Sequence, residues 1–291
     1  MKESITIITD GGIDDIFAIV FLSRIENISI DKIIAVAGNG SAHQAQSNIQ
    51  FFLPNYRERI YSWDNSQYAQ KCPKHLIHGD TSFSGLNIVL RQKKLIDIGD
   101  ILTGRSETIL SLAPLTLLSR LLDIDNCRKY KIVIMGGAIE NGIGNDSTYS
   151  EYNFMVDPTA TNQIFLSGCY PIIVPLDVTR QITFGNELER ILDPDLKTIF
   201  DLLKGRYLNL GQTQIPLHDL TAASFLVAPD AFTLRHRHAE VIETPLEYAG
   251  CLLLDQHMYS RKPSNCLIIN KAEIPRIKYE VINQMAELKH E

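Results

Sequence analysis

Three aspartates, Asp10, Asp14 and Asp15, occur within six positions of the sequence, between two stretches that are almost entirely apolar. Carboxylates repel one another and lose hydration when they are crowded, so such a cluster is typical of a site that holds positive charge. Helix capping is the alternative, because aspartate is favoured in the first turn of a helix in any protein. Three aspartates that follow an apolar stretch and a Gly-Gly pair favour a bound cation over capping.

The residue types indicate which cation this would be. Ligands that offer only oxygen favour a hard cation, Ca²⁺ or Mg²⁺, over zinc. Calcium takes about six to eight oxygen ligands, which is more than this cluster supplies alone. We expect further ligands from His218-Asp219, a polar pair that opens an otherwise apolar segment. The alternative interpretation of this pair is a helix cap beside an ordinary histidine.

The elements that must position these residues follow a regular pattern. Apolar stretches rich in β-branched residues end at glycines or polar residues, and stretches with apolar residues at helical spacing follow them. The predicted strands are 4–9, 32–37, 107–112, 131–135 and 170–175, and the predicted helices are 13–25, 41–52 and 158–167, with Pro114 at the first position of a further helix. This alternation predicts an α/β fold, a mostly parallel sheet flanked by helices on both faces. In such folds the ligand site lies beyond the carboxyl ends of the strands, where the aspartates occur.

The pattern loosens after residue 182. A predicted helix over 186–203 is interrupted at Asp193-Pro194-Asp195, and 204–217 is a polar connection suited to a lid. Residues 218–227 are apolar enough for a buried helix, whereas the run Arg235-His236-Arg237-His238 is interpreted as a solvated surface stretch. Because no segment is typical of a linker, we expect one domain over residues 1–291.

The overall composition excludes several classes of function. The chain has 291 residues, of which 45% are hydrophobic and 21% charged, with a net charge of −6 and a pI of about 5.8. This acidic balance argues against partners such as nucleic acid or an anionic membrane. Five scattered cysteines without a C-x-x-C spacing argue against a disulfide framework and a structural zinc site. The sequence lacks an apolar run of roughly 20 residues and a leader pattern, so we expect a cytoplasmic protein.

The residues around the aspartates read Ile8-Thr9-Asp10-Gly11-Gly12-Ile13-Asp14-Asp15. Further motifs follow in order: Val36-Ala37-Gly38-Asn39, Ala113-Pro114-Leu115-Thr116, Met135-Gly136-Gly137-Ala138, Gly144-Asn145, Glu151-Tyr152-Asn153, Asp157-Pro158 and His218-Asp219. The series resembles the inosine–uridine nucleoside hydrolase family, whose signature after the first strand is D-x-D-P-G-x-D-D. Two positions depart from that signature, because Ile8 replaces its first aspartate and Gly11 its proline. We take the missing acid to lie outside the metal ligands, so we expect metal binding to survive.

The resemblance implies a Rossmann-like nucleoside hydrolase fold and calcium-dependent hydrolysis of the N-glycosidic bond of ribonucleosides, which gives ribose and free base. It assigns the Ca²⁺ ion to Asp10, Asp15, Asp219 and the backbone carbonyl of Thr116. Asp10 would also act as the general base toward water, and His218 as the acid that protonates the leaving base. By analogy with the family, the chain would form a homodimer or homotetramer.

The resemblance also implies how a nucleoside would be bound. Asp14 and Asn153 would bind the 2′ and 3′ hydroxyls, and Glu151 and Asn145 the 5′ hydroxyl. Asn39 would contact the ribose or the base, and His78 would lie near the base. Without the family, the asparagines are equally typical of loops and the histidines of structural positions.

Base preference and two other functions stay open at this stage. The presence of His78 and His218 favours a pyrimidine or mixed inosine–uridine preference, with 72–85 and 204–217 facing the base and Tyr207 and Gln212 as candidate contacts. A Mg²⁺-dependent phosphohydrolase is a second hypothesis, but the sequence has no G-x-x-x-x-G-K-[ST] motif. A non-catalytic nucleoside or ribose binder is a third, which the departures at Ile8 and Gly11 motivate.

Overall fold

The computed structural model describes residues 2–63, 83, 86, 88–89, 93–103, 106–122, 127–139, 144–145, 147–255 and 261–286. Within these residues the chain builds a central eight-stranded sheet in the order β3-β2-β1-β4-β5-β6-β12-β9. Its strands are β1 (Glu3–Thr9), β2 (Ile28–Ala35), β3 (Ile60–Ser62), β4 (Thr108–Ser111), β5 (Lys131–Met135), β6 (Ile172–Val174), β9 (Phe232–Arg237) and β12 (Cys266–Ala272). All neighbouring pairs are parallel except β12 with β9, which confirms the predicted mostly parallel sheet.

The strands read as continuous apolar runs because both faces of the sheet are covered. Successive side chains of a strand point to opposite faces, so Ile7 belongs to one buried cluster and its neighbour Ile8 to the other. Ile33 and Ile34 on β2 divide in the same way. A parallel sheet that is buried on both sides requires this composition.

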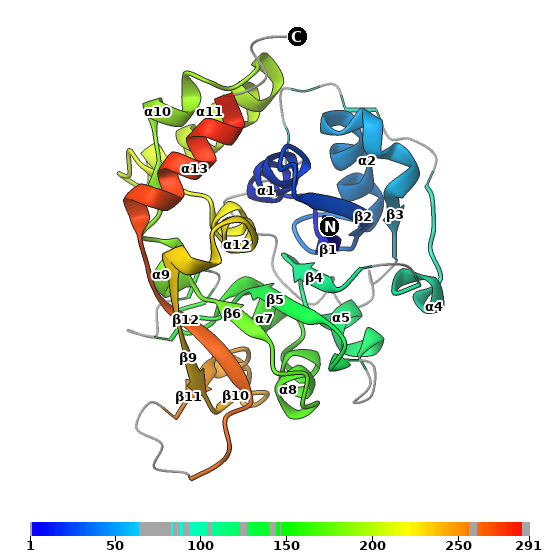
Figure 1. Cartoon of the computed structure of the whole chain (residues 1–291). Helices are drawn as coiled ribbons and strands as arrows, with labels where there is room; N and C mark the ends of the chain where they lie inside the picture. The colour runs from blue at the N-terminus through cyan, green and yellow to red at the C-terminus, as the bar shows by residue number, and fades with distance from the viewer. Residues whose placement is uncertain are drawn as a thin grey trace.

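Helices lie on both sides of the sheet, as Figure 1 shows. One apolar cluster joins the sheet to α1 (Ile13–Ser23), α2 (Ala42–Phe52), α11 (Pro194–Asn209), α12 (His218–Val227) and α13 (Ile274–Ala286). The other cluster joins it to α4 (Ile98–Ile101), α5 (Thr116–Leu121), α7 (Tyr152–Val156) and α8 (Pro158–Leu166). Helices α1 and α12 lie side by side although they are far apart in the chain.

The remaining described elements are short. They are α9 (Leu176–Thr179), α10 (Asn186–Glu189), the antiparallel pairs β7 (Thr183–Phe184) with β8 (Ile215–Pro216) and β10 (Ala239–Val241) with β11 (Leu252–Leu254), and 3-10 turns over Pro54–Arg59, Pro229–Ala231 and Leu246–Tyr248. Among the described helices, none is both long and apolar enough to cross a membrane.

The strand order fixes where a ligand site can lie. The chain builds β1, β2 and β3 outward in one direction and then returns to place β4 on the other side of β1. The loops that leave β1 and β4 therefore diverge and open a crevice beyond their carboxyl ends, as in other doubly wound sheets. Asp10 follows β1 directly, so the aspartate cluster lies at this crevice.

Two predictions about local structure are wrong. Pro114 lies ahead of the helix cap Leu115 and not at the first helical position of α5. Residues 204–209 are the last turns of α11, so the polar connection is shorter than predicted. Most of the run Arg235-His236-Arg237-His238 lies in β9. This strand pairs with β12 on one side and is at the edge of the described sheet. Arg235 and His236 remain exposed there, in agreement with the solvated surface that the sequence predicts.

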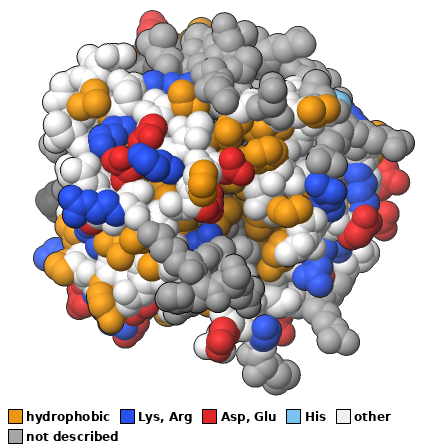
Figure 2. All heavy atoms as spheres, turned by 90° about the horizontal axis from the view of Figure 1, so that it is seen from above, with side chains coloured by type: hydrophobic (Ala, Val, Ile, Leu, Met, Phe, Trp, Pro, Cys, Tyr) orange, Lys and Arg blue, Asp and Glu red, His pale blue; other side chains and the backbone are white. Residues whose placement is uncertain are grey.

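Charged side chains are mixed on the face that Figure 2 shows, where Lys and Arg lie among Asp and Glu. Among the described residues, ion pairs join Lys197 with Glu189 at 2.6 Å and Arg276 with Asp230 at 2.8 Å. Exposed pairs of this kind contribute about 0–1 kcal/mol each, so they matter mainly for solubility.

Candidate active site

Four buried aspartates meet at the crevice. Asp14 and Asp15 lie in the first turn of α1, and Asp219 is the second residue of α12. One carboxylate oxygen from each of these three lies within 4.8 Å of the others. Asp10 joins the group through the electrostatic interaction of its carboxyl group with that of Asp15. All four side chains are almost fully buried, with Asp14 the most exposed at 8%.

The local folds of α1 and α12 explain this convergence. Both helices pack side by side, and both start at the end of the molecule where the carboxylates lie. The amino ends of helices carry partial positive charge, which favours acidic side chains there. The backbone N–H of Gly12 also donates to Asp15 at 3.0 Å, so the first turn of α1 fixes this carboxylate.

The electrostatics of the cluster favour the binding of a cation. Burial raises the pKa of Asp10 to about 6, and hydrogen bonds from Asn39 only partly offset this effect. Burial, followed by the charges of the neighbouring aspartates, raises the pKa values of Asp15 and Asp219 well above the usual range. In addition, Oδ1 of Asp219 is buried and has no hydrogen-bond partner among the described residues. A divalent cation would satisfy both features, because buried carboxylates are stable when they bind metal.

Asn39 and Gly38 hold Asp10 in place. The Asn39 backbone N–H donates to one carboxylate oxygen of Asp10 at 2.9 Å, and its side-chain Nδ2 donates to the other at 2.8 Å. A Cβ atom at Gly38 would lie 2.1 Å from Oδ2 of Asp10, so only glycine leaves room for the carboxylate. The contact of Asn39 with substrate stays a prediction. The structure shows that Asn39 orients Asp10, the candidate general base.

The turn after Asp10 has a backbone that proline cannot adopt. Gly11 has a φ of +66°, whereas proline is fixed near about −65°. Its N–H donates to the Thr9 hydroxyl at 3.1 Å, and that hydroxyl donates to Asp15. Glycine in place of the family's proline therefore supplies an additional donor that orients a carboxylate of the cluster. Ile8 is fully buried in the apolar cluster on the α5 side of the sheet.

A small pocket beside the cluster gathers most of the other predicted site residues. It is lined by Asp14, Asn39, Leu112, Met135, Asn145, Glu151, Tyr152, Asn153, His218 and Asp219. Residues from six separate parts of the chain thus meet at the crevice, although their sequence positions are far apart. His78 was predicted to lie near the base, and it falls outside the described residues.

Asn153 and Glu151 are positioned by the ends of neighbouring strands. Nδ2 of Asn153 donates to the carbonyls of Leu112 and Met135, at 3.3 and 3.2 Å, so its Oδ1 is the atom suited to accept from a ligand hydroxyl. Glu151 caps α7, where its carboxylate accepts from the N–H groups of Asn153, Phe154 and Gly137. Burial nevertheless raises the pKa of Glu151 to about 7.

Asn145 and Thr116 make structural contacts near the pocket. Oδ1 of Asn145 accepts from the backbone N–H of Tyr152 at 2.9 Å, which ties its loop to α7. The Thr116 hydroxyl donates to Asp157 at 2.8 Å, and the Thr116 carbonyl accepts from the Ser119 hydroxyl at 3.1 Å. The predicted role of this carbonyl as a metal ligand stays a prediction.

His218 opens α12 and lines the pocket beside Asp219. Its Nδ1 lies 2.7 Å from the hydroxyl of Thr179, a fully buried residue at the end of α9. Tyr207 on α11 is buried, and burial and the charge of Asp14 raise its pKa. Gln212, the other candidate contact with the base, is exposed.

Two residues of the site were not predicted. Thr9 donates to Asp15, and Thr179 contacts His218. Both follow the general rule that strand ends carry site residues, because Thr9 ends β1 and Thr179 lies on the short helix after β6. That position is the signal that could have identified them.

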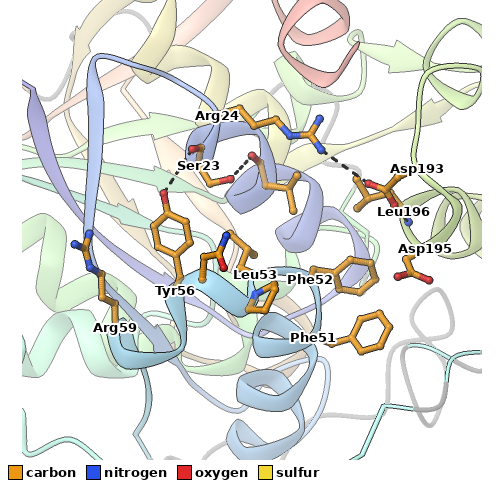
Figure 3. Close-up of a pocket in the computed structure, with 13 residues that line it drawn as sticks. Ser23, Arg24, Phe51, Phe52, Leu53, Tyr56, Arg59, Asp193, Asp195 and Leu196 are labelled. Atoms are coloured by element: carbon orange, nitrogen blue, oxygen red, sulfur yellow. Dashed lines mark hydrogen bonds and ion pairs between the residues drawn. The ribbon is translucent and has the colours of Figure 1, made fainter. Parts of the chain in front are cut away.

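A second, more open pocket of about 770 Å³ lies where α1 and α2 end and α11 begins (Figure 3). It is therefore at the amino ends of the strands, away from the aspartate cluster. Its charged groups bind parts of the fold: Arg24 donates to the Met285 carbonyl at 2.9 Å and Arg59 to the Ile30 carbonyl at 2.6 Å. These contacts of both arginines in this pocket are thus structural.

Comparisons with known proteins agree with this geometry. A family model described as inosine-uridine preferring nucleoside hydrolase matches residues 5–278. The chain is 29% identical to the non-specific ribonucleoside hydrolase RihC of Shigella sonnei, over 91% of this chain and 92% of that protein. It is 30% identical to RihC of Salmonella paratyphi A, over 91% and 93%.

Solved structures of low sequence identity share the fold. A plant nucleoside hydrolase, the PpNRh1 enzyme, has a TM-score of 0.87 at 21% identity and covers 99% of this chain and 100% of its own. A purine-preferring ribonucleoside hydrolase from Gardnerella vaginalis has a TM-score of 0.82 at 20% identity, with 98% of each chain covered.

The fold and the site thus define an enzyme of the nucleoside hydrolase type. The chain belongs to the inosine-uridine preferring nucleoside hydrolase family.

Proposed function

We propose that this chain hydrolyses the N-glycosidic bond of ribonucleosides in a calcium-dependent reaction, with a pyrimidine or mixed inosine–uridine preference. The proposal rests on one observation: Asp14, Asp15 and Asp219 each offer a carboxylate oxygen at the strand ends, and these oxygens lie within 4.8 Å of one another. The printed activities of the relatives, ribonucleoside hydrolases of the RihC type, support the same reaction.

The donor set of the cluster fits a hard cation. All its side-chain ligands are carboxylates, and the buried Oδ1 of Asp219 has no partner among the described residues. Asp10, Asp15, Asp219 and the Thr116 carbonyl would hold the ion, which suits Ca²⁺ because calcium prefers several oxygen ligands. When bound, the cation supplies positive charge that favours ionisation of a nearby water.

The chain's own groups would perform the proton transfers. Asp10 would accept a proton from the attacking water, and the two hydrogen bonds from Asn39 hold its carboxylate in one orientation. Burial raises the pKa of Asp10 to about 6 in the metal-free fold, and a bound cation would lower it, so the carboxylate would be ionised and able to accept a proton near neutral pH. His218 would donate a proton to the departing base, since glycosidic cleavage needs a stabilised leaving group.

Recognition of ribose would come from the groups around the pocket. Asp14 and Oδ1 of Asn153 can accept hydrogen bonds from the 2′ and 3′ hydroxyls, and Glu151 and Asn145, which line the same pocket, would bind the 5′ hydroxyl. Buried acceptors of this kind lose their partners when a hydroxyl is absent, so they select ribose over deoxyribose. We also propose that the protein is cytoplasmic and forms a homodimer or homotetramer. Size-exclusion chromatography with light scattering would test the oligomeric state.

The experiment that tests this function compares uridine, cytidine, inosine and adenosine by release of reducing sugar. The protein is first stripped of metal with a chelator and then assayed with Ca²⁺, with Mg²⁺ or without metal. We expect ribose from uridine and inosine only when Ca²⁺ is restored. Tight nucleoside binding without ribose would favour a non-catalytic binder, and phosphate release from nucleotides would favour a phosphohydrolase.

A further inference from the structure

Thr179 is in direct contact with the candidate acid. Its Oγ1 lies 2.7 Å from Nδ1 of His218, although the two residues belong to different helices, α9 and α12. Thr179 is fully buried, and α9 packs against both α12 and β12. The hydroxyl therefore has a fixed position, which a surface threonine would not have.

The contact constrains the histidine ring. Nδ1 and Nε2 lie on different edges of the imidazole, so the contact at Nδ1 restricts rotation of the ring and thereby sets the direction of Nε2 in a residue that lines the pocket. The other contact of the hydroxyl is with the Leu176 carbonyl, at 3.5 Å, one turn earlier in α9. A hydroxyl both donates and accepts hydrogen bonds. The Thr179 hydroxyl can therefore accept a hydrogen bond from Nδ1–H of His218 and donate one to the Leu176 carbonyl.

We propose that Thr179 is a positioning residue that acts through His218, by holding the imidazole so that Nε2 delivers its proton to the leaving base. The inference rests on the proposed function. The transfer is balanced when Nε2–H moves to a nitrogen of the base as the glycosidic bond breaks, while Nδ1–H stays on the ring and donates to Thr179. Thr179 touches neither substrate nor the reacting atoms.

A substrate with a leaving group that needs no protonation separates this role from a general effect on folding. In 4-nitrophenyl β-D-ribofuranoside the departing phenolate is stable as an anion, so its release does not depend on an acid. Thr179→Val removes the hydroxyl with little change in volume. It should lower kcat for uridine and inosine by about 10²-fold, and change kcat for the nitrophenyl riboside by less than about threefold.

Three further variants make the test specific. Thr179→Ser keeps the hydroxyl and should restore nucleoside activity to within about threefold of the wild type. Thr221→Val is the matched control, because Thr221 is an equally buried threonine on α12 whose hydroxyl bonds only to the Leu217 carbonyl among the described contacts. In a His218→Ala background, Thr179→Val should have no additional effect on nucleosides, because residues that act as a unit are not additive.

Equal losses on nucleosides and on the nitrophenyl riboside would overturn the inference, as would wild-type nucleoside activity in Thr179→Val. Nitrogen NMR of the His218 ring keeps the inference testable if the wild type hydrolyses neither substrate, a result that would reject the proposed function instead. We expect the Nδ1 signal of His218 to shift in Thr179→Val and to stay unchanged in Thr221→Val. An unchanged signal in both variants would show that Thr179 does not hold the ring.

Discussion

Asp15 and Asp219 are 204 positions apart in the chain, yet a carboxylate oxygen of one lies within 4.8 Å of a carboxylate oxygen of the other. Their helices, α1 and α12, pack side by side on one face of the sheet and start at the same crevice. Because both carboxylates are buried, their mutual repulsion is costly unless a cation or a proton neutralises it. We therefore predict that the stability of the protein depends on metal and on pH.

Calcium should stabilise the protein more at pH 8 than at pH 5. In the metal-free fold, the raised pKa values of Asp10, Asp15 and Asp219 keep protons on the cluster at acidic pH, and these protons must leave before an ion binds. The stabilisation by a ligand grows with its affinity, so the increase in Tm that calcium causes should rise with pH. Thermal denaturation with and without calcium measures this increase. A calcium effect that is equal at both pH values, or that persists in Asp219→Asn, would contradict the assignment.

Replacing Gly38 by alanine should disable the site without unfolding the protein. The new Cβ would lie 2.1 Å from Oδ2 of Asp10, so the carboxylate must leave its bonds with Asn39. We expect kcat for uridine to fall by about 10²-fold or more, the scale of a lost general base. Gly40→Ala is the control, because the nearest atom to its Cβ is 4.0 Å away. Full activity in Gly38→Ala would argue against Asp10 as the base.

Glu151 should make the metal-free protein less stable as the pH rises. Burial raises its pKa from 4.5 to about 7, so between these values the folded state binds more protons than the unfolded state. The free energy of unfolding then decreases with pH over this window, by on the order of 3 kcal/mol in total, and the full contribution is present only below pH 4.5. Urea denaturation from pH 4.5 to 8, with a chelator present, would measure the slope. Glu151→Gln should have a flatter profile, and an unchanged slope would assign the effect to other groups.

Removing the 2′ hydroxyl of the substrate should abolish most of the activity. If Asp14 and Asn153 bind the ribose hydroxyls, 2′-deoxyuridine leaves a buried acceptor without a partner. We expect kcat/KM to be lower than for uridine by at least about 10³-fold. Asp14→Ala should reduce the difference between the two substrates, because the acceptor is then absent for both. Similar kcat/KM values for uridine and 2′-deoxyuridine in the wild type would place the ribose elsewhere.

The sequence predicts the first half of the fold well because its strands are apolar runs with clear ends. β5 (Lys131–Met135) has the predicted bounds, since Gly136-Gly137 follows the run directly. β2 starts at Ile28, four residues earlier than predicted, because Asp31 and Lys32 interrupt the apolar pattern of this strand. β9 and β12 were not predicted as strands, because β9 is an antiparallel edge strand with exposed polar residues.

The site was predictable where residues follow one another in the chain. The spacing of Asp10, Asp14 and Asp15 indicates a cation site by itself, and His218-Asp219 was expected to complete it. The contacts of Asn39 with Asp10 and of Thr179 with His218 depend on how separate strands and helices pack. A position near a strand end can mark each residue separately, but local sequence does not indicate which residues pair, so the contacts become visible only in the folded structure.

The central claim is that one divalent ion is held between α1 and α12. Calorimetric titration of calcium into metal-free protein tests it most directly, with Asp219→Asn as the variant. The control is Asp230→Asn, because Asp230 is exposed and pairs with Arg276, not with the cluster. We predict one ion per chain for the wild type and for Asp230→Asn, and greatly weakened binding for Asp219→Asn. Absence of calcium binding in the wild type, or undiminished binding in Asp219→Asn, would contradict the account.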